Sequence, residues 1–138
     1  LKSQRILLTW MIDDANVLQQ IRRVIRSDDF TEPLYRTVAE LLYQQMDEGL
    51  VNPAQIMNHF SDEEEHRKVA ELFHTKIREL TTREEQEKAL NETVRRVKQN
   101  SLDEMARRLE PTDIAGLQKL MEDKRALQDA KRLHISII

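Results

Sequence analysis

The sequence of 138 residues contains no cysteine. This absence excludes disulfide bonds, thiolate catalysis and cysteine-based zinc sites, and it fits a reducing cytoplasm. Glycine and proline are also scarce, with 2 and 3 residues, against roughly 7% and 5% in average proteins. Because few residues interrupt a helix, long helices are the expected structure, and β-sandwiches and β-barrels are excluded.

Long apolar runs and a strong charge of one sign are missing as well. No apolar run approaches the roughly 18 residues that a membrane span needs, so we expect no membrane insertion. Residues 1–80 contain 10 basic and 14 acidic side chains, and residues 81–138 contain 12 and 11. Neither part is basic enough for a nucleic-acid footprint. The chain begins with Leu rather than Met, so we expect it to be a piece of a longer protein, with no signal peptide before it.

Residues 1–80 carry apolar side chains at spacings of three and four, which predicts a bundle of about five helices. Trp10 is expected to anchor the core, and Phe30 to fill it from a connection. Gly49 is expected to close the third helix. Asn52 followed by Pro53 predicts the start of the fourth helix. Capping boxes at Ser61 with Glu64 and at Thr82 with Glu85 predict the starts of the next two.

Residues 81–138 are expected to form a second part, a long helix and a C-terminal antiparallel helical hairpin that projects from the bundle. The apolar stripe of the long helix is narrow, which predicts that the helix is not buried. A third capping box, Ser101 with Glu104, leaves open a kink near Asn100. Residues 110–113 predict a turn between the two antiparallel helices. The tail, residues 134–138, alternates apolar and polar side chains and is expected to pack on something.

No residue pattern predicts catalysis. Glu63 with His66, and Glu71 with His74, have the Glu-x-x-His spacing of di-iron carboxylate proteins, but such sites need that motif on two facing helices. Both copies here fall on one predicted helix, so polar residues on a solvated face are favoured over a metal site. The acidic pair Asp28 and Asp29 is explained by the preference of carboxylates for helix starts. We expect no catalytic residue, no metal and no cofactor.

The stronger functional signal is apolar excess on the hairpin and tail, which favours a partner-binding surface. Eight residues are the candidates for contact with a partner: Leu117, Leu120, Met121, Lys124, Leu127, Lys131, Ile135 and Ile137. The two lysines are expected to steer encounter rather than to supply affinity. An alternative stays open: Leu117, Leu120 and Leu127 would face the opposing helix around Val97, Met105 and Leu109, which would leave only the tail free.

The order of motifs resembles that of a known family. The motifs are Ile6-Leu7-Leu8-Thr9-Trp10-Met11-Ile12, Asp29-Phe30 leading into Tyr35-Arg36, Asp47-Glu48-Gly49, the long helix with its hairpin, and His134-Ile135-Ser136-Ile137. Together they resemble the C-terminal helicase-binding domain of bacterial DnaG-type DNA primase, over essentially the whole chain. The resemblance implies a non-catalytic cytoplasmic domain. Its bundle would modulate the helicase, and its hairpin would dock on the N-terminal domains of the hexameric DnaB-type replicative helicase. Primer synthesis itself would belong to upstream domains.

Two other interpretations remain. The N-terminal domain of a DnaB-type helicase has a similar bundle, and in that case a linker and a P-loop ATPase would follow in the gene. A carboxylate-histidine metal protein is the enzyme alternative, which elemental analysis of the purified chain would test.

We predict that the isolated chain binds single-stranded DNA weakly and without sequence preference, because both parts are near neutral and aromatic stacking platforms are few. Fluorescence anisotropy with labelled oligonucleotides at physiological salt measures this. Sub-micromolar binding would contradict the prediction.

Overall fold

A computed structural model describes residues 2–74, 82–132 and 135–137, without the side chains of 74 and 130–132. The described residues contain helices and no strand, which confirms the prediction of an all-α protein. The helices are α1 (Lys2–Asp13), α2 (Ala15–Ile21), the short 3₁₀-helix η1 (Ser27–Asp29), α3 (Pro33–Asp47), α4 (Pro53–His59), α5 (Glu63–His74), α6 (Arg83–Arg108) and α7 (Ile114–Arg132).

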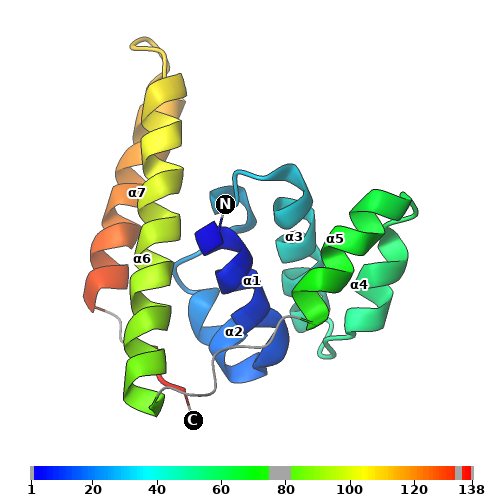
Figure 1. Cartoon of the computed structure of the whole chain (residues 1–138). Coiled ribbons are helices and arrows are strands. Elements are labelled where there is room, and N and C mark those ends of the chain that lie inside the picture. The colour runs from blue at the N-terminus through cyan, green and yellow to red at the C-terminus, as the bar shows by residue number, and fades with distance from the viewer. Residues whose placement is uncertain (1, 75–81, 133–134, 138) are drawn as a thin grey trace.

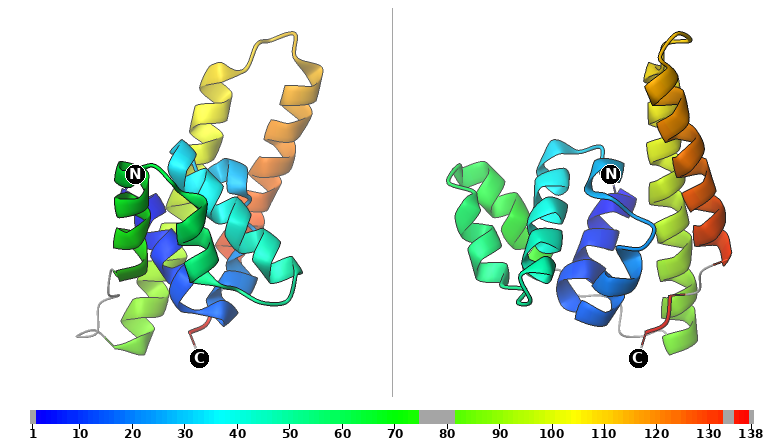
Figure 2. Two further views of the ribbon diagram at one scale, coloured as in Figure 1. Left: turned by 90° about the vertical axis from the view of Figure 1, so that its right-hand side faces the viewer. Right: turned by 180° about the vertical axis from the view of Figure 1, so that it is seen from behind.

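The elements form a bundle and a projecting pair of helices (Figure 1). Helices α1 and α2 lie between α6 on one side and α3 on the other. Helix α4 packs against α3 and α5, and α5 also packs directly against α1. Helices α6 and α7 run side by side, and the turn that joins them stands clear of the bundle, as the two further views in Figure 2 show. The tail returns to the end of the molecule where α6 begins.

One large apolar cluster holds the bundle together. It includes Trp10, which is 7% exposed, and Phe30, which is fully buried, so both core predictions are confirmed. Leu90, Val94 and Val97 of α6 also belong to this cluster. The expectation that the long helix is not buried is therefore wrong for its first half, because α1 packs directly along it. A narrow apolar stripe is buried when one neighbouring helix covers it.

Most predicted helix starts are confirmed. The side chain of Asn52 accepts hydrogen bonds from the backbone of Ala54 and Gln55, and that of Thr82 accepts from Glu85. Gly49 follows α3 with φ of 91°, a left-handed conformation that favours glycine. The Ser61 capping box is wrong in register, because the carboxylate of Asp62 accepts from the backbone of Glu65 instead.

Helix α6 also runs unbroken through Asn100 and Ser101. The predicted capping box at Ser101 does not form a helix start, because the Ser101 hydroxyl donates to Asp29 of η1. The proposed boundary between 80 and 81 lies outside the described residues.

We predict that Leu90→Ala lowers the free energy of unfolding by about 2–5 kcal/mol, because it opens a cavity where α6 meets the bundle. Urea unfolding followed by circular dichroism measures the loss. Leu50→Ala is the control: Leu50 is 73% exposed, and its loss should cost no more than about 0.5 kcal/mol. Equal effects of the two substitutions would show that α6 is not part of the core.

Candidate partner-binding surface

The projecting pair of helices has a small apolar seam of its own. Leu102 of α6 and Leu120 and Leu127 of α7 are buried together, and Met105 and Leu109 pack against them. Two of the candidate contact residues are buried in this seam: Leu120 is 8% exposed and Leu127 is 6% exposed. These two side chains hold the hairpin together and are not available to a partner.

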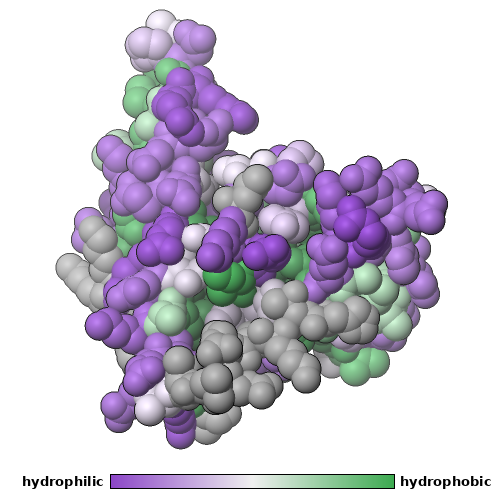
Figure 3. Space-filling view, viewed as in Figure 1, coloured by the Kyte–Doolittle hydropathy of each residue, from purple (hydrophilic) through white to green (hydrophobic). Residues whose placement is uncertain are grey.

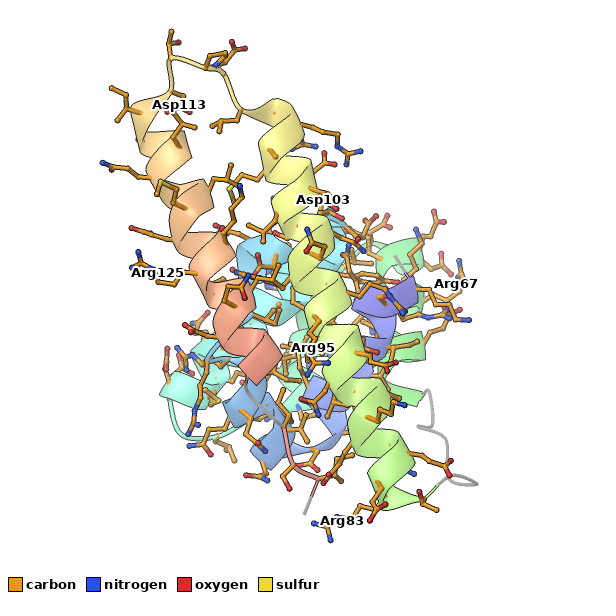
Figure 4. The ribbon with its side chains drawn as sticks, turned by 90° about the vertical axis from the view of Figure 1, so that its left-hand side faces the viewer. Arg67, Arg83, Arg95, Asp103, Asp113 and Arg125 are labelled. Atoms are coloured by element: carbon orange, nitrogen blue, oxygen red, sulfur yellow. The ribbon has the colours of Figure 1, made fainter. Side chains whose placement is uncertain are left out.

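The turn at the tip is closed tightly. The carboxylate of Asp113 accepts a hydrogen bond from the backbone N–H of Gly116 at 2.9 Å, which caps α7. A Cβ at Gly116 would lie 2.5 Å from Cδ1 of Leu109. Gly116 therefore lets Leu109 pack across the hairpin near its tip, where Figure 4 shows Asp113.

An exposed apolar stripe runs along the other side of α7. Leu117 is 40% exposed and Met121 is 66% exposed, and Ile114, which sequence reasoning left out of the contact residues, is 70% exposed. Their spacing of three and four places them on one helix face. Lys124 continues this face and is exposed. Hydrophobic side chains are visible between hydrophilic ones along the projecting hairpin in Figure 3.

The tail residues among the candidates lie elsewhere. Ile135 is 1% exposed and belongs to the bundle core, and Ile137 packs against the same core. The expectation that the tail packs on something is confirmed. The alternative interpretation is right for Leu120 and Leu127, which pack against Met105 and Leu109, and wrong for the exposed Leu117 and for a free tail. The side chain of Lys131 lies outside the described part of the structure. Of the eight candidates, the structure brings Leu117, Met121 and Lys124 together on an exposed face.

A buried cluster of charges fixes the hairpin to the bundle. The ammonium group of Lys98 on α6 donates to Oδ2 of Asp29 on η1 at 3.0 Å, and lies 3.7 Å from Oδ1 of Asp123 on α7. All three side chains are 3% exposed or less. Arg26, which is half exposed, pairs with the same oxygen of Asp123. Three segments that are far apart in the sequence therefore meet at one cation.

Asp29 receives two further hydrogen bonds. The Ser101 hydroxyl donates to its Oδ1 at 2.7 Å, and the backbone N–H of Arg26 donates to its Oδ2 at 2.8 Å. The prediction that helix-start preference accounts for Asp28 and Asp29 covers only this last contact. The sequence contains no signal for the contacts of Asp29 with Lys98 and Ser101, because these two residues look like ordinary surface residues of a charged helix.

A second ion pair joins the hairpin to η1 at the surface. The ammonium group of Lys119 donates to Asp28 at 3.0 Å. This hydrogen bond lowers the pKa of Asp28. Since the folded pKa is the lower one, the contribution of the pair to stability is present at neutral pH and is lost as the pH falls through the folded pKa. The two groups are about half exposed, so solvent keeps that contribution small.

A cleft lies between the outer half of the hairpin and the bundle. Its volume is about 460 Å³, and Asp28, Thr31 and Arg36 of the bundle side face Ser101, Glu104, Met105 and Arg108 of α6 across it. The outer half of the hairpin is thus set apart from the bundle, and its sides are open to solvent.

The described part of the histidine and carboxylate pattern, which leaves out the side chain of His74, forms no metal centre. Both Glu-x-x-His sequences lie on α5, and no three histidine, aspartate or glutamate side chains among the described residues are grouped to hold a metal ion. Likewise, no helix in the described ranges is both long and apolar enough to cross a membrane.

Comparisons of the chain with protein-family models, with curated proteins and with solved structures found no match.

We predict that Lys98→Met lowers the free energy of unfolding by about 3–5 kcal/mol, because it leaves the buried carboxylates of Asp29 and Asp123 without their shared cation. Urea unfolding measures the change. The matched control is Arg67→Met, which breaks an exposed ion pair with Glu71 on α5 and should cost no more than about 1 kcal/mol. If Lys98→Met costs no more than the control, the cluster does not stabilise the fold.

Proposed function

We propose that this chain is the non-catalytic helicase-binding domain of a bacterial DNA primase. In this proposal the domain docks on the N-terminal domains of a hexameric DnaB-type helicase and recruits primer synthesis to the replication fork. Such a protein works in the cytoplasm, and its chemistry belongs to other domains of the primase.

The observation that carries the proposal is the apolar stripe of Ile114, Leu117 and Met121 on a hairpin that projects from the bundle. An exposed apolar helix face at spacings of three and four is the form that helix-in-groove recognition takes. Burying one leucine or methionine side chain in a partner is worth roughly 1.5–3 kcal/mol, so the stripe is enough for a specific contact. The family resemblance of the sequence supplies the identity of the partner.

The charges beside the stripe support a partner with acidic groups at the edge of its groove. Lys124 and Arg125 are both exposed, and neither has an ion-pair partner among the residues that the structure describes. Charges at the rim of an interface mainly raise the association rate. We therefore assign affinity to the apolar stripe and steering to the two cations.

A second candidate is the N-terminal domain of a DnaB-type helicase, to which the motifs are also similar. The coding sequence downstream of residue 138 decides between the two, since a linker and a P-loop ATPase would mark the helicase.

We predict that the double variant Leu117→Asp, Met121→Asp binds the replicative helicase at least about 100-fold more weakly, because two apolar contacts are lost. Surface plasmon resonance with the immobilised helicase hexamer measures the dissociation constant. Both positions are exposed, so circular dichroism should show an unchanged helix content.

Leu50→Asp is the matched control, because Leu50 is 73% exposed but lies between α3 and α4, away from the hairpin. It should bind the helicase like the unmodified chain. If the double variant binds as tightly as this control, the stripe on α7 is not the docking surface.

A further inference from the structure

The tail lies against the side chains of two helices that are far apart in sequence. Asn91 on α6 is 5% exposed, and its amide group pairs with both backbone groups of Ile135. Its Oδ1 accepts from the N–H of Ile135 at 2.8 Å, and its Nδ2 donates to the C=O of Ile135 at 3.0 Å. The hydrogen bonds between Asn91 and the tail therefore involve only the backbone groups of Ile135.

Gln20 on α2 does the same for the next residue. Its Oε1 accepts from the N–H of Ser136 at 3.1 Å, and its Nε2 donates to the C=O of Ser136 at 3.0 Å. In an extended chain the backbone groups of successive residues point to opposite sides. Helices α6 and α2 thus hold consecutive tail residues from the two sides, as neighbouring strands would.

Glu87 completes the pattern one turn before Asn91 on α6. Its Oε1 accepts from the N–H of Ile137 at 2.7 Å and from the hydroxyl of Ser136 at 3.3 Å. The side of α6 therefore holds the first and third residues, and the hydroxyl of the second adds a side-chain preference for serine.

The side chain of Ile135 anchors the tail in the apolar core. It is 1% exposed and packs in the main core of the bundle with Val94 and Leu18 among the members of that cluster. If the tail left, the core would lose this side chain, and the amide of the buried Asn91 would lose two hydrogen bonds. Both losses are costly, so the empty groove favours another occupant of the same shape.

We propose that the groove between α2 and α6, formed by Gln20, Glu87 and Asn91, is a peptide-binding site. Its ligand is an extended segment of a partner protein with an aliphatic residue, a serine and a second aliphatic residue in succession. The segment 135–137 occupies the groove as a built-in competitor, and a partner segment binds by displacing it.

The hairpin does not depend on the tail for its attachment to the bundle. Arg26 with Asp123, Lys98 with Asp29, and Lys119 with Asp28 hold α6 and α7 to η1 independently. Displacement of residues 135–137 therefore opens the groove and leaves the hairpin in place. The tail is joined to α7 through residues 133–134 only, so its high local concentration sets how strongly a partner segment must bind to displace it.

The test uses the full chain with Ile135→Asp, which weakens the tail in the groove. The probe is a fluorescent peptide with the sequence of residues 133–138, Leu-His-Ile-Ser-Ile-Ile, and anisotropy gives its dissociation constant. The peptide should bind this variant at least about tenfold more tightly than a control peptide with aspartate in place of its first isoleucine. It should bind the unmodified chain more weakly than the variant, because the tail competes.

Adding Asn91→Leu to the variant should weaken peptide binding at least about tenfold, because the amide that hydrogen-bonds the peptide backbone is replaced by an apolar side chain of similar size. If Ile135→Asp loses helix content by circular dichroism, Ser136→Pro takes its place, since it removes the N–H bound by Gln20 and keeps Ile135. Equal binding of the two peptides, or binding that is indifferent to Asn91→Leu, would overturn the proposal. Leu117→Asp with Met121→Asp should leave peptide binding unchanged, which separates this site from the proposed helicase surface.

Discussion

The contact between Lys98 and Asp29 sets how the hairpin of α6 and α7 is arranged against the bundle. Both groups are buried, and a buried charge is tolerated only with a partner and further hydrogen bonds. Asp29 satisfies this condition through Lys98, Ser101 and the backbone of Arg26. Lys98 also approaches Asp123 of α7. Because a charge pair has few acceptable geometries, the cluster fixes how α6 and α7 stand against the bundle, which apolar packing alone would define less strictly.

The helices and the core could be predicted from the sequence because their signals are local. Spacings of three and four identified the buried face of α3, and Asn52 and Thr82 marked helix starts. The charge cluster could not be predicted in this way. Asp29 and Lys98 are 69 residues apart, and each has a satisfactory local explanation, one at a helix start and the other on a charged helix face. Only the tertiary structure brings them together.

The candidate surface shows a related difficulty on a single helix. Leu117 and Leu120 are both apolar and only three residues apart, so periodicity placed them in one stripe. In the structure Leu120 faces Leu102 across the hairpin, whereas Leu117 lies beside Ile114 and Met121 on the open side. A broad apolar stripe supplies both an internal seam and an exposed face. Sequence spacing does not tell which of its residues belong to the seam and which to the exposed face. The tail packs as expected, but Ile135 and Ile137 are not partner contacts. Apolar spacing does not reveal the six hydrogen bonds that the tail makes with side chains of α2 and α6.

The polar and the apolar side chains of the hairpin therefore have different roles: the first fix its position, and the second are left for a partner. The ion pairs of the hairpin with Arg26, Asp28 and Asp29 are directional, and they hold α6 and α7 in one position on the bundle. The contacts of its exposed apolar side chains are not directional, and these side chains belong to neither apolar cluster of the described residues. A helix that is already held in position loses little further freedom when a partner covers it, and this lowers the entropic cost of association. The directional contacts thus make the small apolar stripe a more effective docking surface than three side chains on an unanchored helix would be.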